Sequence, residues 1–290
     1  MIEPNIIKKE AKDSTFLRVA FFEPKIKPLG VIQIIHGFGE GIEHYAEFGD
    51  FFAKNGFVCA IHDQRGFGKM PDISIKEKKA ARGIIPRYES FLEDAQTIRN
   101  EIIKLYPDIP VTLFGFSMGG NIAINHLLEN SQDQYDKLIL ASPWLRLYRP
   151  KPKFVDGLAK IIGSATGRLK TLTNTDVNNI TRNPERLQEI LTNEIFHNRI
   201  SIRMYSGVLQ RGEHAIRNIK HVTIPTLVLA PGQDRIVCPK AVIELYENMG
   251  ENARLEVYPE AYHSLHDDII NQEVFSVILD FCSQPKVKSL

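Results

Sequence analysis

A serine lies at the centre of the segment Gly115-Phe-Ser-Met-Gly119, and a serine in this setting could act as a nucleophile. The apolar run 111–116 precedes it and the helix-like run 121–128 follows, which is the strand, turn and helix order of a G-x-S-x-G elbow. A glycine on each side permits a sharp turn that exposes the hydroxyl. We predict that Ser117 attacks a carbonyl carbon and that the amide of Met118 donates to the resulting oxyanion.

The elbow pattern alone also fits an ordinary connection between a strand and a helix, so the prediction depends on partners. A serine needs a histidine to take its proton and an acid to fix the tautomer of that histidine. Asp234 directly follows the apolar run 226–230, and His263 follows the run 255–258. The chain order of serine, acid and histidine is the order found in α/β-hydrolases. We therefore predict a triad of Ser117, Asp234 and His263.

Other residues near the predicted triad are weaker candidates. His266 comes one helical turn after His263 and would point along a starting helix rather than toward the serine. Glu256 lies inside a predicted strand, and Asp267 and Asp268 resemble exposed residues in the first turn of a helix. Position at a strand end therefore favours the predicted acid and histidine over these alternatives.

The loop after the run 31–35 reads H-G-F-G-E and is the predicted source of a second oxyanion donor. Glycines on both sides of Phe38 allow its amide to turn inward beside the donor of the elbow. We expect His36 to hold this loop by hydrogen bonding, with Gly37 and Glu40 also supporting it. A plain glycine-rich turn is the alternative interpretation.

The composition is that of an ordinary globular protein with little net charge. Of the 290 residues, 43% are hydrophobic and 24% are charged, and the formal net charge is +1. We expect no nucleic-acid partner, because no global field favours a polyanion, and neutral or amphiphilic substrates fit better. The N-terminus lacks the apolar region of a signal peptide and no window approaches eighteen apolar residues, so we predict a cytoplasmic protein.

The three cysteines, Cys59, Cys238 and Cys282, are an odd number at wide spacing. This spacing favours neither a disulfide framework nor a metal site. We expect reduced thiols, no bound metal and no cofactor, so that the side chains named above must supply the chemistry themselves.

Short β-rich runs alternate with helical stretches and predict a doubly wound, mostly parallel α/β sheet. Two intervening stretches, 45–54 and 90–105, are expected crossover helices. The predicted strands are 15–22, 31–35, 58–62, 111–116, 138–141, 226–230 and 255–258.

Between residues 144 and 221 the alternation stops, and no β-run is apparent. We predict a hydrolase core formed by 1–143 and 222–290, with a helical cap or lid at 144–221 inserted after the strand 138–141. Three apolar residues at helical intervals in this segment are candidates for substrate binding: Phe154, Leu158 and Ile162. They would line an acyl tunnel or belong to a lid that rests transiently on micelles or a membrane surface. The alternative is a helical excursion that only enlarges the core.

Taken together, these residues resemble the monoacylglycerol lipase and lysophospholipase branch of the α/β-hydrolases, which is also grouped as serine aminopeptidase-like hydrolases. The resemblance spans roughly 31–268. The motifs that carry it follow the expected order along the chain: His36-Gly-Phe-Gly-Glu40 with Tyr45, Asp63-Gln-Arg-Gly-Phe-Gly68, Gly115-Phe-Ser-Met-Gly-Gly120, Gly232-Gln-Asp-Arg-Ile-Val237 and Tyr262-His263-Ser-Leu-His266. Two positions depart from the family pattern. Lys69-Met70 replaces a small hydroxyl residue, and Phe116 stands where histidine is common.

The resemblance implies a cofactor-free serine hydrolase acting on carboxylic esters of acyl chains, with monoacylglycerols or lysophospholipids as the natural class. An aminopeptidase-like amide hydrolase is the main alternative, and it would need carboxylates to bind a free amine. The cap acids that could do so are Asp176, Glu185, Glu189 and Glu194. A non-catalytic ligand-binding protein of the same fold is a third interpretation, although such proteins typically lose a triad residue.

Overall fold

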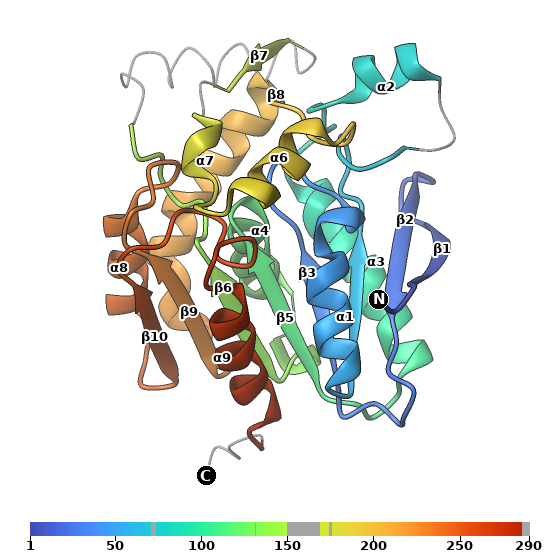
Figure 1. Cartoon of the computed structure of the whole chain (residues 1–290), viewed down its shortest axis with the longest axis vertical. Helices are drawn as coiled ribbons and strands as arrows, with labels where there is room; N and C mark the ends of the chain where they lie inside the picture. The colour runs from blue at the N-terminus through green and yellow to red at the C-terminus, as the bar shows by residue number, and fades with distance from the viewer. Residues whose placement is uncertain (71–73, 131, 150–168, 174–175, 286–290) are drawn as a thin grey trace.

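The computed structural model describes residues 1–70, 74–130, 132–149, 169–173 and 176–285. Within these residues, eight strands form one sheet in the order β1-β2-β4-β3-β5-β6-β9-β10. The strands β4, β3, β5, β6, β9 and β10 pair in parallel, whereas β1 and β2 form an antiparallel edge. The predicted doubly wound, mostly parallel sheet is therefore confirmed (Figure 1).

Strands and helices alternate along the chain as the sequence pattern predicts. The strands of the large sheet are β1 (Asn5–Glu10), β2 (Phe16–Phe22), β3 (Gly30–Ile35), β4 (Phe57–His62), β5 (Val111–Phe116), β6 (Lys137–Ala141), β9 (Thr226–Pro231) and β10 (Ala253–Tyr258). The α-helices are α1 (Ala46–Lys54), α2 (Ile75–Ala81), α3 (Glu89–Leu105), α4 (Met118–Glu129), α6 (Pro184–Thr192), α7 (Ile202–Asn218), α8 (Pro239–Glu247) and α9 (Asn271–Ser283). Short 3₁₀ helices are η1 (Ile42–Tyr45), η2 (Gln132–Gln134), η3 (Val177–Asn179) and η4 (Ile219–His221).

The central strands form because their apolar residues are buried on both faces of the sheet. Every residue of β3, β4, β5 and β9 is buried, as expected for parallel strands covered by helices on both sides. The edge strand β1 is not predicted from the sequence. Its residues are exposed or half-buried, and its sequence, Asn-Ile-Ile-Lys-Lys-Glu, has neither a continuous apolar run nor an alternation of apolar and polar residues.

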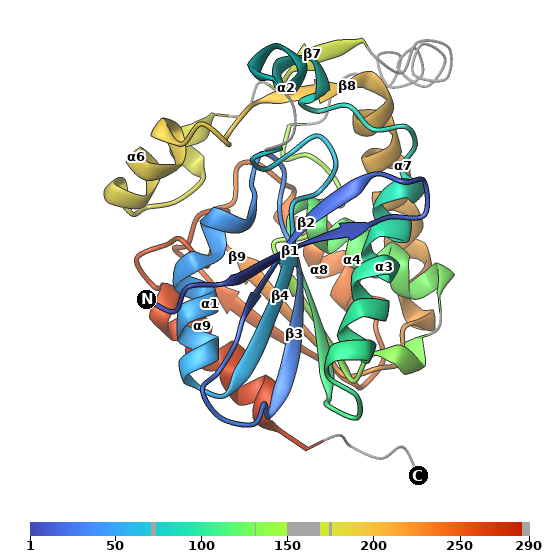
Figure 2. The same cartoon turned by 90° about the vertical axis from the view of Figure 1, so that its right-hand side faces the viewer.

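Helices cover both faces of the sheet in two layers. On one face, α1 and α9 pack through an aromatic cluster that includes Phe48, Phe52 and Phe275. On the opposite face, α3, α4, α7 and α8 contribute apolar side chains such as Phe91 and Val208 to a second core cluster. Figure 2 shows these layers on either side of the sheet. The sheet is thereby covered by a packed layer of helices on each face.

The described part of the predicted cap contains α6, α7 and a small antiparallel sheet formed by β7 (Lys170–Leu172) and β8 (Arg199–Ser201). The expectation that no strand occurs between residues 144 and 221 is therefore wrong. Each of these strands is three residues long, which is too short to give a recognisable period of two. The boundaries 1–143, 144–221 and 222–290 stay a prediction.

The helices of this segment have different surroundings. In Figures 1 and 2, α6 and the β7–β8 sheet lie beyond the carboxyl ends of the central strands. By contrast, α7 packs along α4, where the Asn121 amide donates to the Val208 carbonyl at 3.0 Å. The candidate substrate residues Phe154, Leu158 and Ile162 lie outside the described residues. No helix in the part of the chain that the structure describes is long and apolar enough to cross a membrane.

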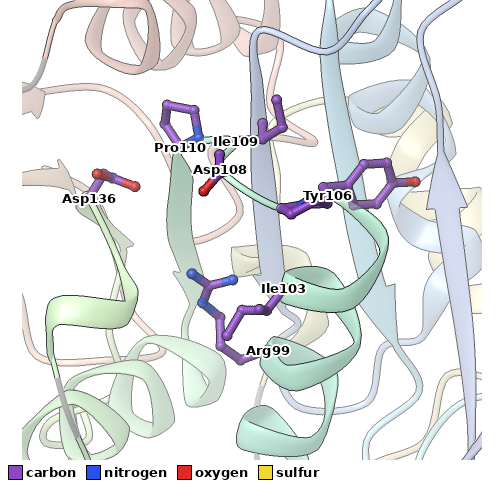
Figure 3. Close-up of a pocket in the computed structure, with 8 residues that line it drawn as sticks. Arg99, Ile103, Tyr106, Asp108, Ile109, Pro110 and Asp136 are labelled. Carbon is purple, nitrogen blue, oxygen red and sulfur yellow. The ribbon is translucent and has the colours of Figure 1, made fainter.

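A cavity of about 320 Å³ lies at the amino-terminal end of β5 (Figure 3). Arg99, Tyr106 and Asp136 are among the residues that line it. Ser117 follows the opposite end of β5. The cavity is therefore remote from the predicted triad.

Candidate active site

The predicted nucleophile lies in a strained turn between β5 and α4. Ser117 has φ 52° and ψ −116°, a conformation that residues other than glycine adopt rarely. Glycines make the turn sterically feasible. A Cβ on Gly115 would lie 2.5 Å from the carbonyl oxygen of Gly119, and a Cβ on Gly119 would overlap the carbonyl oxygen of Ile35. The two glycines thus have the steric role that the elbow pattern predicts.

Loops after β5, β9 and β10 bring Ser117, Asp234 and His263 together. Nδ1 of His263 lies 2.6 Å from Oδ2 of Asp234, and its Nε2 lies 2.9 Å from Oγ of Ser117. An ionised carboxylate only accepts hydrogen bonds, so Nδ1 carries the ring proton and Nε2 accepts from the hydroxyl. All three residues are buried. The arrangement can remove the proton of the serine as its oxygen attacks an electrophile.

Asp234 is oriented by its own loop. Its Oδ1 accepts hydrogen bonds from the amides of Ile236 at 2.8 Å and Val237 at 2.9 Å, which leaves Oδ2 for the histidine. Two residues earlier, a Cβ on Gly232 would overlap the carbonyl oxygen of Pro259. The glycine of the G-x-D motif therefore lets the loops after β9 and β10 approach each other.

Glu40 and His36 hold the predicted oxyanion loop. Oε2 of Glu40 accepts from the amide of Gly37 at 2.7 Å and from the hydroxyl of Tyr45 at 3.0 Å. Nε2 of His36 accepts from the amide of Gln64 at 3.0 Å, so Nδ1 carries the proton and donates to the Gly37 carbonyl at 2.8 Å. Burial lowers the pKa of His36 to about 3, which keeps the ring neutral. The predicted support residues thus share one hydrogen-bond network.

The amides of Phe38 and Met118 are the predicted oxyanion donors. Met118 is the first residue of α4, so its N–H has no acceptor within the helix. Among the backbone hydrogen bonds of the described loops and turns, neither amide is a donor. Both amides are therefore available to a negatively charged oxygen, and their role in catalysis stays a prediction.

The chain matches a known family over most of its length. The family described as "Serine aminopeptidase, S33" matches residues 26–269. The chain belongs to this family. The resemblance to the monoacylglycerol lipase and lysophospholipase branch of the α/β-hydrolases, predicted from the motifs, is confirmed.

Known proteins match most of this chain at low sequence identity. An uncharacterized abhydrolase domain-containing protein of Dictyostelium discoideum is 28% identical over 94% of this chain, and the chain spans only 28% of the length of that relative. Phospholipase YtpA of Bacillus subtilis is 24% identical over 89% of this chain and 96% of its own length. The crystal structure of a monoacylglycerol lipase from Paleococcus ferrophilus has 25% identity and a TM-score of 0.81, and the match covers 92% of this chain and 98% of the other.

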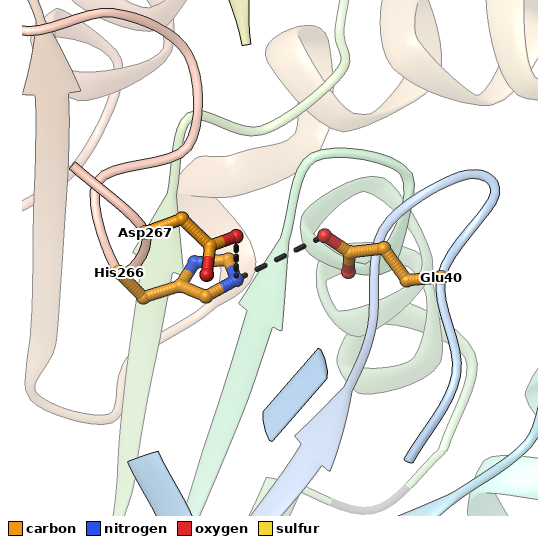
Figure 4. A group of neighbouring side chains, drawn as sticks. All are labelled: Glu40, His266 and Asp267. Atoms are coloured by element: carbon orange, nitrogen blue, oxygen red, sulfur yellow. Dashed lines mark ion pairs between the residues drawn. The ribbon is translucent and has the colours of Figure 1, made fainter. Parts of the chain in front are cut away.

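A buried cluster of titratable side chains, Glu40, His266 and Asp267, lies at the predicted oxyanion loop (Figure 4). Nε2 of His266 lies 3.5 Å from Oδ2 of Asp267 and 3.8 Å from Oε1 of Glu40, and the latter distance is too long for a hydrogen bond. Burial lowers the pKa of His266 to about 4. Burial, together with the Asp267 carboxylate, raises the pKa of Glu40 to about 8. The structure therefore places His266 in this cluster and His263 beside Ser117.

The same cluster contains the residue types that bind metal ions. One donor atom each of Glu40, His266 and Asp267 lies within 4.8 Å of the other two. However, Arg186 already pairs with Asp267, with 2.5 Å between Nη2 and Oδ1. A guanidinium therefore supplies positive charge to the cluster from the protein itself.

Two acids that follow the predicted histidine form ion pairs with residues of the predicted cap. The sequence pattern did not indicate these contacts. The prediction that Asp267 and Asp268 are exposed first-turn residues is wrong, because both are fully buried in the turn before α9. Arg186 of α6 pairs with Asp267, and Arg182 pairs with Asp268 at 2.6 Å. These ion pairs connect the predicted cap to the loop that carries His263. Partners more than eighty residues apart leave no local signal in the sequence.

Phe116, which departs from the family pattern, packs between the two histidines of that loop. Its ring lies 5.0 Å from the ring of His263 and 4.6 Å from the ring of His266, measured between centroids. The substitution of histidine by phenylalanine thus leaves the predicted triad intact and adds apolar packing beneath it.

Proposed function

We propose that the chain is a serine hydrolase that cleaves carboxylic esters of acyl chains through an acyl-enzyme intermediate. The observation that carries the proposal is the buried hydrogen-bonded series from Ser117 through His263 to Asp234, with distances of 2.9 and 2.6 Å. Its members come from three separate loops. The other carboxylate oxygen of Asp234, Oδ1, accepts hydrogen bonds from two backbone amides. Membership of a hydrolase family supports the same conclusion.

In the proposed reaction, Nε2 of His263 takes the proton of Ser117 as the serine oxygen attacks the ester carbonyl. Asp234 stabilises the imidazolium that forms. The amides of Phe38 and Met118 donate to the oxyanion. The tetrahedral intermediate collapses, the bond to the alcohol oxygen breaks, and the alcohol leaves with the proton from the histidine. Water then attacks the acyl-enzyme by the same steps and releases the carboxylic acid.

Monoacylglycerols or lysophospholipids are the proposed natural substrate class. One relative is named a phospholipase, and one solved relative is named a monoacylglycerol lipase. A net charge of +1 is compatible with neutral or zwitterionic esters. The predicted cap, with Phe154, Leu158 and Ile162 as candidate acyl contacts, would set the preferred chain length. A cytoplasmic location and transient contact with micelles or membranes stay predictions.

An aminopeptidase-like amide hydrolase is the alternative that the family description suggests. Such an enzyme needs a carboxylate beside the nucleophile to bind the free amine of its substrate. The cap acids considered for this role are all exposed to solvent: Asp176, Glu185, Glu189 and Glu194. Their exposure favours ester over amide substrates. A non-catalytic role is less well supported, because His263 lies within hydrogen-bond distance of both Ser117 and Asp234.

Labelling with a fluorophosphonate tests the proposed nucleophile. We expect the probe on Ser117 of the wild-type protein and no adduct at this position in Ser117→Ala. A second assay compares a p-nitrophenyl ester with an aminoacyl p-nitroanilide, and each kcat/KM is divided by the uncatalysed hydrolysis rate of that compound. The larger rate enhancement is expected for the ester. A larger enhancement for the anilide would favour the amide alternative.

A further inference from the structure

The segment between α6 and β8 runs directly over the predicted oxyanion loop. A Cβ on Gly39 would lie 3.0 Å from the carbonyl oxygen of His197 and 3.3 Å from the ring of Phe196. A Cβ on Gly41 would lie 3.2 Å from Cγ2 of Ile195. Three consecutive residues of the cap segment therefore follow the surface of the loop at van der Waals distance.

His197 is the residue of this segment whose ring contacts the ring of Phe38. Its ring stacks on Phe67 with parallel planes and 5.1 Å between centroids, and it meets the ring of Phe38 edge-on at 6.1 Å. Phe67 and Trp144 also meet Phe38 edge-on, at 5.2 and 6.2 Å. Three aromatic side chains thus surround the ring of Phe38, and one of them comes from the cap segment. Edge-on contacts of this kind are favourable and directional.

Two hydrogen bonds fix the ring of His197. Its Nδ1 accepts from the amide of Arg199 at 3.3 Å, so Nε2 carries the proton and donates to the carbonyl of Gly66 at 2.9 Å. Gly66 belongs to the loop after β4 that also carries Phe67. Only 7% of His197 is exposed, and burial lowers its pKa to about 4, so the ring stays neutral in a single tautomer. The ring is therefore a rigid link between this loop, the cap and Phe38.

Phe38 lies between two glycines, so contacts with other residues must hold the direction of its amide. The residues on either side, Gly37 and Gly39, have no side chains to restrict rotation, and Gly39 has φ 81°. On the Gly37 side, the carboxyl group of Glu40 accepts a hydrogen bond from the Gly37 amide. On the Gly39 side, the neighbouring atoms are the carbonyl oxygen of His197 and the ring of Phe196, both in the predicted cap. The carbonyl of Gly37 belongs to the same planar peptide group as the Phe38 N–H, and it accepts from Nδ1 of His36. The packing of the Phe38 ring holds the other side of this peptide group, and the two contacts together set where the N–H points.

We propose that His197 is a positioning residue that completes the oxyanion hole from the cap, by holding the ring of Phe38 so that its amide faces the reacting carbonyl. The inference rests on the proposed function, since it assigns a device to the same site. His197 touches no reacting atom and acts only through Phe38. The hole is then fully formed when the segment from Ile195 to His197 is seated on the loop.

Three substitutions of His197 separate the packing of its ring on Phe38 from its hydrogen bond to the Gly66 carbonyl. His197→Ala removes both contacts, His197→Phe keeps the ring but not the donor to Gly66, and His197→Gln keeps a donor but not the ring. Loss of one oxyanion donor costs about 10²–10³-fold in kcat, and a misplacement of about 1 Å can cost about 10²-fold. For His197→Ala we expect kcat on p-nitrophenyl butyrate to fall by roughly 10- to 100-fold, with KM within about twofold of wild type. The other two variants should lie between.

Inhibition by a trifluoromethyl ketone reports the oxyanion hole itself, because the alkoxide of the serine adduct occupies the hole. In each variant we expect the inhibition constant to rise by the same factor by which kcat/KM falls. A purely structural role would lower the thermal midpoint without this correlation. His221→Ala is the control, because His221 lies in the same predicted cap within η4 and makes none of the contacts with Phe38 described above. It should leave kcat and the inhibition constant unchanged.

The outcomes distinguish this inference from the proposed function. If fluorophosphonate fails to label Ser117 of the wild-type protein, the proposed function fails. If the wild type is labelled and the variants are labelled more slowly but completely, both proposals stand. If folded His197→Phe and His197→Gln keep wild-type kcat, labelling rate and ketone affinity, only the role of His197 is overturned. These two conservative variants decide the matter even where the alanine variant does not fold.

Discussion

An asparagine at position 234 would keep the shape of the side chain but reverse its hydrogen bond to His263. In the structure, Oδ1 of Asp234 accepts the amides of Ile236 and Val237, and Oδ2 accepts the ring N–H at 2.6 Å. The oxygen of an asparagine would keep the two backbone amides, so its NH₂ group would face the ring. Nδ1 must then accept, and the proton moves to Nε2, which faces Ser117. The histidine could no longer act as a base.

A wrong tautomer of this kind costs about 10⁴-fold in kcat for the Ser-His-Asp arrangement. At about 1.4 kcal/mol per tenfold, this corresponds to about 5 kcal/mol of lost transition-state stabilisation. The assay is kcat for Asp234→Asn on p-nitrophenyl butyrate, with the thermal midpoint measured in parallel. Glu256→Gln is the matched control, because it neutralises the rival acid in β10, and it should leave kcat unchanged. A folded Asp234→Asn protein with kcat within about tenfold of wild type would refute the assignment of the acid.

Further substitutions and substrates test other parts of the site. Gly119→Ala should destabilise the fold by about 3 kcal/mol in urea unfolding, because its Cβ would overlap the carbonyl oxygen of Ile35. As the control, Gly250→Ala should change the free energy of unfolding by about 0.5 kcal/mol or less, because no atom lies within 4 Å of its Cβ. Burial raises the pKa of Glu40 from 4.5 to about 8, so the folded protein keeps a proton that the unfolded chain loses near pH 4.5. The stability from this proton is complete below about pH 4.5 and is lost as the pH rises to about 8. Glu40→Gln should therefore flatten the curve of unfolding free energy against pH in this range. Equal slopes for the wild type and the variant would contradict the buried proton. For p-nitrophenyl esters, kcat/KM should be higher for laurate than for acetate, and equal values would argue against an apolar acyl site.

The parts of the fold that the sequence predicts are those with a local physical cause. Strands such as Val111–Phe116 are recognisable because burial on both faces requires a continuous apolar run. The elbow at Ser117 is recognisable because close backbone contacts exclude any side chain at Gly115 and Gly119. In both cases a few neighbouring residues carry the whole constraint.

The parts that the sequence does not predict depend on contacts between distant segments. The ion pairs of Arg182 and Arg186 with the two acids before α9 become visible only when the cap is folded onto the histidine loop. His197 has no distinctive neighbours in the sequence, and its contact with Phe38 crosses from the cap to the loop after β3. Short elements such as β7 give no periodic signal either. Sequence patterns therefore indicate Ser117, Asp234 and His263, but they do not indicate the residues that position these three side chains.

The acyl-enzyme itself provides the most direct test of the proposed reaction. A slowly hydrolysed p-nitrophenyl ester is mixed with the enzyme, the reaction is quenched with acid during turnover, and the peptides are examined by mass spectrometry. We predict that the mass of the acyl group appears on the peptide containing Ser117, decays as substrate is exhausted and is absent in Ser117→Ala. A wild-type enzyme that turns over the ester with no acyl group on this peptide, together with an active Ser117→Ala variant, would contradict the proposed nucleophile.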